Sequence, residues 1–497
     1  MWLVLLVLVI TLVLICIKRQ YSYWERNGIP GPKPIPIAGN FYRNFVGKIS
    51  AGEIITEIYN KYEGYPFVGI YRATSPVLLV RDPDFVKNIF VRDFKHFHDN
   101  DIEIDKEVDP IFGRNPFVMK GDEWKSKRAQ LTTLFTSGKI KGMYQFLLRS
   151  SNRMVQYIED ETKSSNEFEA REICVRFALD NVAACAFGLE GKSFDEPYSQ
   201  FRELADNFIS PDGIRNKIIG LLFVLCPSFF KKMKFKLVPK DVEDKLMEIV
   251  KSSLKYRRDN NIVRNDFLDA VSSLQKEDGL FTSVDIVANA ASFFGDGYET
   301  SSRVMAFLVF ELAANPDIQD KLRNEINTVL ENNDNSLNYE VIQNMKYLDA
   351  CLSESLRKNS IVHNLNKICT EDYTYTPTNP DFKNITVKIK AGESVVVPLT
   401  GLQMDPKYFD EPQKFKPERF LGPISYNRST YLPFGDGQRV CLGQRFAQTQ
   451  IKVGIANIIK NFRLKVSSKT KLPLKLDPYF IMRHAIGGLW VHFEKIQ

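Results

Sequence analysis

The cysteine loop (residues 434–443) carries one cysteine, Cys441, in a stretch that glycines allow to bend. Gly435 and Gly437 permit tight turns and let the backbone approach a flat ligand closely, because they lack a β-carbon. Arg439 places a positive charge two residues before the sulfur, and a helical pattern begins directly after the loop. A cation and a helix N-terminus both favour the thiolate, the form of cysteine that binds metals. These features predict a metal-binding thiolate rather than a cysteine that only fills the core.

The cysteine loop resembles a motif of the cytochrome P450 family, Phe-x-x-Gly-x-Arg-x-Cys-x-Gly, which surrounds the cysteine that binds haem iron. Every fixed position is matched, by Phe434, Gly437, Arg439, Cys441 and Gly443. The resemblance implies that the cofactor is haem b (iron protoporphyrin IX) with Cys441 as its axial ligand. It also implies the family's fold, mainly α-helical with a small β region, in which the haem lies between a long central helix and the cysteine loop.

Trp124 and Arg128 lie one turn apart on a predicted helix, so their side chains share a face. Alone, this pair is compatible with an ordinary amphipathic helix whose arginine is solvated. The resemblance implies instead that Trp124 and Arg128 hold a haem propionate, a carboxylate that suits the planar fork of arginine. Lys367 stands where the family usually has an arginine for the same purpose, and we expect it to supply a charge without that fork.

A long central helix is predicted from residues 282–283, which are typical N-cap types, to about Asn315, where Pro316 stops it. Gly295 and Gly297 lie in its middle, and each costs ~1 kcal/mol relative to alanine inside a helix. We therefore expect a distorted turn that opens a groove at this point.

The polar residues of that turn are the predicted catalytic residues. Gly297, Glu299 and Thr300 match the family's pattern Ala/Gly-Gly-x-Asp/Glu-Thr. The resemblance implies that Thr300 supplies a hydroxyl for proton delivery and that Glu299 relays protons from outside, as a carboxylate near a transfer path can. Asp296 departs from the pattern. We interpret it either as a carboxylate near the haem that supplies protons or anchors a cationic substrate, or as a residue that points away and bonds to a neighbouring helix.

Glu354 and Arg357 are three residues apart on a predicted helix, and Arg419 follows before the cysteine loop. They resemble the family's buried Glu-Arg-Arg network, which is structural rather than chemical. Residues 359–361, Asn-Ser-Ile, replace the Tyr-Pro-Pro that the family has after the arginine. We expect a different shape of the pocket wall at this place.

An uncharged apolar run opens the chain and ends at Lys18 and Arg19. It is at the short end of the lengths that span a bilayer, and the basic pair predicts that the following chain faces the cytosol. A cleaved signal peptide is the alternative, but the run lacks a basic start and a cleavage site. The predicted organisation is a membrane anchor over 1–20, a proline-rich hinge over 21–39 and a haem-thiolate catalytic domain over 40–497.

Three further segments carry local predictions. Tyr21 and Trp24 are expected at a membrane interface, where amphipathic aromatic residues collect. Residues 66–80 alternate between apolar and polar types, which predicts half-buried strands. Residues 218–230 are apolar and are followed by lysines, so they form either a buried helix or a surface that dips into lipid headgroups.

The composition excludes several classes of protein. A hydrophobic content of 44% in 497 residues rules out a disordered chain. The net charge of +7 comes from dispersed residues, which favours an acidic partner or an anionic membrane over nucleic acid. Seven cysteines without a CxxC pair argue against a zinc site or a disulfide framework.

In residues 94–98 (Phe-Lys-His-Phe-His), 298–302 (Tyr-Glu-Thr-Ser-Ser) and 433–443, the chain is similar to microsomal P450 enzymes of the insect xenobiotic-metabolising kind. This resemblance implies a monooxygenase of the endoplasmic reticulum membrane that inserts one oxygen atom of O2 into a lipophilic substrate. Electrons are expected from NADPH through cytochrome P450 reductase, with cytochrome b5 as a second candidate donor. The predicted reductase-facing residues are Lys125, Lys127, Arg445 and Lys452. Two alternatives stay open: a haem-thiolate isomerase or synthase that acts on peroxides without external electrons, and a non-enzymatic haem-binding protein.

Overall fold

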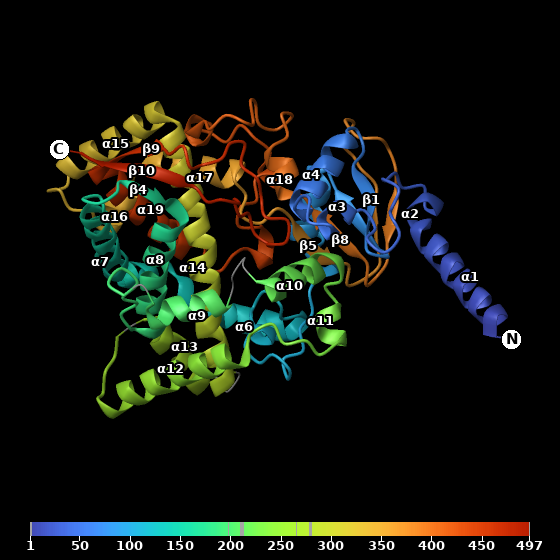
Figure 1. Cartoon of the computed structure of the whole chain (residues 1–497), viewed down its shortest axis with the longest axis horizontal. Helices are drawn as coiled ribbons and strands as arrows, with labels where there is room; N and C mark the ends of the chain where they lie inside the picture. Colours follow the sequence, from blue (N-terminus) through green and yellow to red (C-terminus); the bar gives the residue numbers. More distant parts are fainter. Residues whose placement is uncertain (1, 197, 209–212, 265, 278–280, 497) are drawn as a thin grey trace.

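The computed structural model describes residues 2–196, 198–208, 213–264, 266–277 and 281–496. It consists of a mainly helical body with small sheets, from which the N-terminal helix projects (Figure 1), so the predicted mainly α-helical architecture with a small β region is confirmed. The helices of eleven or more residues are α1 (Trp2–Tyr21), α4 (Ala51–Lys61), α6 (Gly121–Thr132), α7 (Ser137–Glu161), α8 (Ala170–Val182), α10 (Ile214–Leu225), α12 (Lys240–Asp259), α13 (Phe267–Glu277), α14 (Ser283–Ala314), α15 (Pro316–Glu331), α17 (Lys346–Lys358) and α19 (Gln444–Asn461). The shorter α-helices are α2 (Tyr23–Arg26), α3 (Tyr42–Phe45), α5 (Pro83–Lys87), α9 (Gln200–Phe208), α11 (Phe229–Lys232), α16 (Tyr339–Gln343) and α18 (Leu399–Gln403).

A five-stranded sheet lies on the side of the body from which the N-terminal helix projects (Figure 1). Its strands, in spatial order, are β1 (Phe67–Arg72), β2 (Ser75–Val80), β8 (Ser394–Val397), β5 (Leu365–Ile368) and β3 (Asp99–Asn100). β1 and β2 form an antiparallel hairpin with Phe67 opposite Val80, which confirms the strands predicted over 66–80. The smaller sheets join β4 (Glu167–Glu169), β10 (Trp490–Lys495) and β9 (Phe462–Val466), and β6 (Tyr373–Tyr375) with β7 (Val387–Ile389).

The proline-rich segment lies against the open edge of β1. Pro30 accepts a hydrogen bond from the backbone of Gly69 (2.8 Å), and the indole of Trp24 donates to the carbonyl of Ile70 (3.0 Å). Because this cover satisfies the edge, β1 is buried along its whole length rather than half-buried as predicted. The prediction that Trp24 lies at a membrane interface is wrong, since only 3% of Trp24 is exposed and it packs in the core.

The N-terminal helix α1 stands clear of the body over most of its length (Figure 1). Its last residue, Tyr21, contacts the ring of Tyr71 edge-on, at 5.4 Å between centroids. Among the residues that the structure describes, none of the helices combines the length and the hydropathy that a membrane crossing needs. The anchor over 1–20 therefore stays a prediction.

The central helix α14 runs through the body and packs against α8, α13, α17 and α19 (Figure 1). Thr282 and Asp285 form a capping box at its start, and it ends before Pro316, as predicted. The helix α14, which is described throughout, remains helical over its full length, so the glycines do not interrupt it. A β-carbon at Gly295 would overlap the ring of Phe208, so this glycine makes room for a neighbouring side chain.

The apolar segment 218–230 forms the end of α10 and the start of α11. Its side chains are mostly half-buried, and several pack on residues 102–118 of the chain. A β-carbon at Gly220 would overlap the carbonyl of Tyr479, so α10 also lies close to the C-terminal segment. Ile218 on α10 is 52% exposed, and the lysines Lys231 and Lys232 lie in the last turn of α11.

Candidate active site

The cysteine loop has the bent backbone that its glycines predict. Gly435 and Gly437 have φ angles of +75° and +64°, and the N–H of Cys441 donates to the carbonyl of Phe434 (2.9 Å). A β-carbon at Gly437 would overlap the carbonyl oxygen of Phe90 in the π-helical segment η1 (Asn88–Arg92). The sequence predicted that Gly437 makes room for a flat ligand. In the structure this glycine instead makes room for the backbone of η1.

Cys441 lies just before the N-terminus of α19, as predicted. The backbone N–H groups of Gly443 and Gln444 point at its sulfur. The residue Cys441 is solvent-accessible although protein atoms surround its thiol densely, so we infer that it borders an interior space. Burial raises the pKa of the Cys441 thiol, and the two N–H groups and Arg128 offset only part of this effect. The expected thiolate must therefore form on metal binding, since a coordinating thiol loses its proton to the metal's charge.

The side chain of Arg439 is turned toward residues 98–119, and the cation that acts on the sulfur is Arg128 instead, contrary to our expectation. The guanidinium of Arg439 lies over the ring of Trp124, at 3.7 Å from its centroid, and pairs with Asp99 (3.2 Å). Burial lowers the pKa of Arg439 to about 9. Its N–H groups also donate to backbone carbonyl oxygens, those of His98, Pro116 and Met119.

Three side chains that the sequence assigned to a haem propionate come together from α6 and β5, and Arg439 of the cysteine loop joins them. The three are Trp124, Arg128 and Lys367. The buried indole N–H of Trp124 has no hydrogen-bond partner within the described chain. Lys367 is buried, donates to Asn100 (3.0 Å), and has a pKa that burial and the neighbouring Arg439 lower to about 7. Two guanidinium groups, those of Arg128 and Arg439, and the partly protonated Lys367 lie near one carboxylate, Asp99, and this surplus of positive charge suits an anion.

These residues fit haem in both of its requirements. Cys441 supplies an accessible sulfur for the iron, and the cluster around Trp124 supplies an unpaired N–H and surplus cations for the propionate carboxylates. Phe434 closes the cysteine loop by accepting from Cys441, and Gly443 begins the turn into α19. Whether each of them contacts the cofactor stays a prediction.

Asp296 and Thr300 lie one turn apart on α14, and the hydroxyl of Thr300 donates to the carbonyl of Asp296 (2.7 Å). The carboxylate of Asp296 is solvent-accessible yet densely surrounded, and it interacts electrostatically with Cys441. It therefore faces the same interior space as the sulfur. Its hydrogen-bond partner is Asn115 (3.1 Å), which directly follows the short helix η3 (Phe112–Arg114), so the bond to a neighbouring segment that one interpretation expected is present.

Glu299 is fully buried between two arginines. Arg171 on α8 donates to both carboxylate oxygens (3.2 and 3.1 Å), and Arg303, one turn further along α14, donates to Oε1 (2.7 Å). Although burial opposes ionisation, the two cations hold the pKa of Glu299 below its usual value. A carboxylate fixed in this way is poorly suited to exchange protons, so the geometry argues against Glu299 as the predicted relay.

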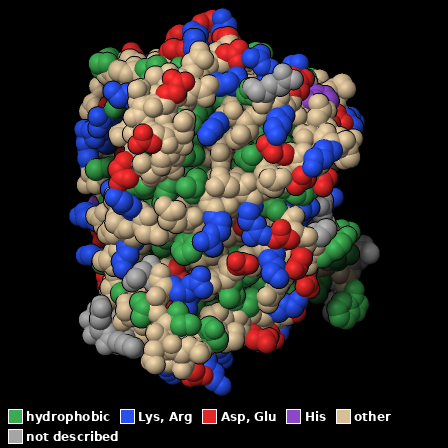
Figure 2. Space-filling model, turned by 90° about the vertical axis from the view of Figure 1, so that its left-hand side faces the viewer, with side chains coloured by type: hydrophobic (Ala, Val, Ile, Leu, Met, Phe, Trp, Pro, Cys, Tyr) green, Lys and Arg blue, Asp and Glu red, His purple; other side chains and the backbone are tan. Residues whose placement is uncertain are grey.

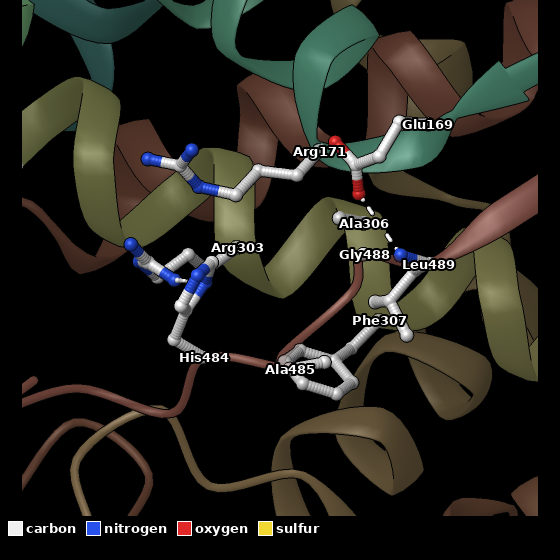
Figure 3. Close-up of a pocket in the computed structure, with 9 residues that line it drawn as sticks. All are labelled: Glu169, Arg171, Arg303, Ala306, Phe307, His484, Ala485, Gly488 and Leu489. Atoms are coloured by element: carbon white, nitrogen blue, oxygen red, sulfur yellow. Dashed lines mark hydrogen bonds between the residues drawn. The ribbon is translucent and has the colours of Figure 1, made fainter. Parts of the chain in front are cut away.

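A small cavity of about 20 Å³ lies beside the two arginines of this ion-pair network (Figure 3). It is lined by Arg171, Arg303 and His484 together with apolar residues, and Glu169 accepts a hydrogen bond from Leu489 at its rim (3.0 Å). Arg303 also donates to His484 (2.9 Å), whose pKa burial lowers to about 4, so this imidazole is neutral. The cavity has room for about one water molecule.

The predicted Glu-Arg-Arg network is confirmed. Arg357 donates to both oxygens of Glu354 (2.7 and 2.8 Å), and Arg419 donates to Oε1 (3.1 Å). Both side chains of the Glu354–Arg357 pair are fully buried. The network joins α17 to the segment that leads into the cysteine loop and so fixes where that loop begins.

Asn359 explains part of the unusual sequence after Arg357. Its side chain donates to Glu311 on α14 (2.8 Å), and Lys358 pairs with the same carboxylate (2.9 Å). Glu311 is buried, so it needs these partners. The departure from the family pattern thus accompanies an acidic residue on the central helix.

Two of the four residues predicted to face a reductase are buried. Lys127 pairs with Asp285 (2.6 Å), and Lys452 pairs with Asp349 (2.9 Å). Lys125 and Arg445 are exposed. Figure 2 shows basic and acidic side chains interspersed over one face of the molecule, in keeping with the dispersed charge of the sequence.

Sequence reasoning missed the partners that are remote in the chain. Asn115 is 181 residues from Asp296, Arg171 is 128 residues from Glu299, and Asp99 is 340 residues from Arg439. None of them stands in a local pattern that marks its role. The sequence could indicate only that Asp296, Glu299 and Arg439 need a partner if they are buried, because a buried charge requires a neighbour. It could not indicate which residue that partner is.

A helical body, an arginine-stabilised cysteine loop and an anion cradle beside an enclosed sulfur define a haem-thiolate protein. The family model "Cytochrome P450" matches residues 29–489 of the chain. The chain is 34% identical to probable cytochrome P450 6a14 of Drosophila melanogaster, over 96% of each protein. It is 34% identical to cytochrome P450 6a2 of the same organism, over 99% of each. It is 32% identical to cytochrome P450 6j1 of Blattella germanica, over 96% of this chain and 94% of the relative.

The chain belongs to the cytochrome P450 family and is a P450 monooxygenase. The resemblance inferred from the motifs, including the similarity to insect members, is thereby confirmed.

Proposed function

We propose that this monooxygenase oxidises lipophilic organic compounds, with electrons that pass from NADPH through cytochrome P450 reductase. The observation that carries the proposal is Cys441, an enclosed and accessible sulfur at a helix N-terminus, beside a cluster of buried cations. The predominantly apolar core that surrounds this region favours a lipophilic substrate.

Different residues of the chain would bind the iron and the propionates of the cofactor. Cys441 would hold the iron of haem b, while Arg128, Lys367 and Arg439 would neutralise the propionates and Trp124 would donate its indole N–H to one of them. When bound, a haem with a thiolate ligand supplies the activation of O2 that allows one oxygen atom to enter a C–H bond.

Thr300 is the proposed site of proton delivery. The hydroxyl of Thr300 donates its hydrogen to the carbonyl of Asp296, and the hydroxyl oxygen can still accept a hydrogen bond from water. A water held in this way would be an oriented proton source beside α14. Glu299 would stabilise this part of α14 through its arginine partners, as a positioning residue.

The proposed location is the endoplasmic reticulum membrane, with residues 40–497 facing the cytosol. The apolar α1 is followed by Lys18 and Arg19, and exposed Ile218 lies in α10, shortly before the lysines of α11. The reductase would approach a basic surface that includes Lys125 and Arg445. Cytochrome b5 is a second candidate donor of electrons.

The first test replaces the ligand. Cys441→Ser is expected to lose the red-shifted Soret band that a thiolate haem shows in its reduced carbon-monoxide complex, and with it NADPH-dependent product formation. Cys226→Ser, a half-buried cysteine at the end of α10, is the matched control and should keep both. Retention of the band in Cys441→Ser would overturn the assignment.

The same preparation separates the alternative functions. A reductase-dependent monooxygenase consumes NADPH and O2 with substrate. An isomerase would instead convert an organic peroxide without NADPH, and a haem carrier would show neither reaction.

A further inference from the structure

Asp296 differs from every other acidic residue on the central helix in its partners. α14 carries four carboxylates, and three of them are paired with lysine or arginine: Asp285 with Lys127, Glu299 with Arg171 and Arg303, and Glu311 with Lys358. Asp296 has no cationic partner among the residues that the structure describes. The structure thus compensates each carboxylate of this helix except the one that faces the interior space.

The carboxylate of Asp296 is nevertheless held in place. Its Oδ2 accepts from the side-chain amide of Asn115 (3.1 Å). Asn115 is itself fixed, because its Oδ1 accepts from the N–H of Phe117 (2.8 Å) and its carbonyl accepts from Val118 (2.9 Å). A loop and the central helix therefore hold this carboxylate in place, close enough to Cys441 to interact with it electrostatically.

Enclosing an ionised carboxylate without a counter-charge costs free energy, and the carboxylate can lower this cost in two ways. It can take up a proton, or it can bind a cation from outside. Burial raises the pKa of Asp296 to about 6, so most of it is still ionised at neutral pH. Protonation alone therefore leaves the charge largely uncompensated under ordinary conditions.

We propose that Asp296 is a substrate-binding residue that anchors positively charged lipophilic compounds, above all protonated or quaternary amines. The inference rests on the proposed function, since it names the class of substrate that enters that site. The apolar surroundings would hold the body of such a compound, while the carboxylate would fix its cationic end near Thr300. This anchor would set both the preference for amines and the carbon atoms that lie within reach of the reacting centre.

The test uses two probes of the same shape that differ in charge. Trimethyl(3-phenylpropyl)ammonium carries a permanent charge and has no free lone pair with which to ligate iron. Its carbon isostere, (4,4-dimethylpentyl)benzene, is neutral. Binding of each probe to the full-length holoprotein is measured by Soret titration and by equilibrium dialysis. The reduced carbon-monoxide spectrum is recorded on each sample, so that a fault of haem ligation is seen separately.

The wild type is expected to bind the ammonium probe roughly tenfold or more tightly than the neutral one, as a desolvated charge pair allows. Asp296→Asn keeps the size of the side chain and its bond to Asn115, and should lose this preference while binding the neutral probe unchanged. Asp296→Glu should retain part of it. Glu107→Gln is the matched control: it removes a carboxylate that is 80% exposed, eight residues before Asn115 in the chain, and should change neither affinity.

Two results would overturn the inference. In the first, the wild type shows an intact thiolate-haem spectrum but binds both probes with equal affinity. The monooxygenase function would then hold, but Asp296 would not be a cation anchor. An equal loss of affinity for both probes in Asp296→Asn would show that the residue only maintains the shape of the site. The first comparison needs no variant, so it decides the question even if Asp296→Asn does not fold.

Discussion

Thr300 is the side chain whose truncation should separate electron supply from productive oxidation. Thr300→Ala removes the hydroxyl that donates to the Asp296 carbonyl but leaves the cysteine loop and the cation cluster untouched. Haem content and NADPH consumption should persist, while electrons are diverted to hydrogen peroxide because protons are no longer delivered in order. The ratio of product to NADPH measures this. Thr300→Ser should restore the ratio, and full coupling in Thr300→Ala would reject the assignment.

Glu299 is expected to act on stability rather than on proton supply. Glu299→Gln leaves Arg171 and Arg303 buried without their anion, at a cost of ~3–5 kcal/mol. The pKa of this carboxyl is depressed in the folded state, so its stabilisation is complete above its ordinary value of 4.5 and is lost as pH falls through the lower folded value. The difference in Tm between wild type and variant should therefore be largest near neutrality and narrow below pH 4.5.

A surface carboxylate provides the control for this experiment. Glu340→Gln breaks an exposed pair with Lys141 and should change Tm very little. If Glu299→Gln kept its Tm but formed less product per NADPH, Glu299 would be a proton relay after all, and its structural role would be rejected.

At the scale of the element, the cysteine loop contains two glycines with positive φ angles, and they have different structural roles. Gly437→Ala adds the strain of a positive φ and a collision with the Phe90 carbonyl, whereas Gly435→Ala adds the strain alone, ~1–2 kcal/mol, because its β-carbon meets no atom closer than 3.8 Å. Gly437→Ala should lower Tm and haem retention far more than Gly435→Ala. Equal losses would mean that contact with η1 does not decide the loop's shape.

At the scale of the whole molecule, the orientation on the membrane can be tested directly. If α1 anchors the chain with Lys18 and Arg19 on the cytosolic side, protease added to sealed microsomes should digest the catalytic domain without detergent. A luminal marker in the same vesicles should stay intact until detergent is added. A catalytic domain that resists digestion together with the marker would place it in the lumen.

The molecule's larger features follow from local signals in the chain. The cysteine loop, the start and end of α14, the β1–β2 hairpin and the Glu-Arg-Arg network each rest on residues close in sequence or on motifs in a fixed order. Turn glycines, N-cap residues and proline act within a few residues, so their effects do not depend on the rest of the fold. These predictions were therefore possible without a tertiary structure.

The direction of charged side chains was decided only by tertiary packing. Arg439 turns away from the sulfur because backbone carbonyls 320 or more residues away accept its hydrogen bonds. Glu299 and Asp296, three residues apart on one helix, have opposite fates because α8 brings an arginine to one and a loop brings only an amide to the other. Sequence alone determined which residues carry charge at the site. The fold determined which charges are paired, because burial makes each charge depend on neighbours that are distant in the chain.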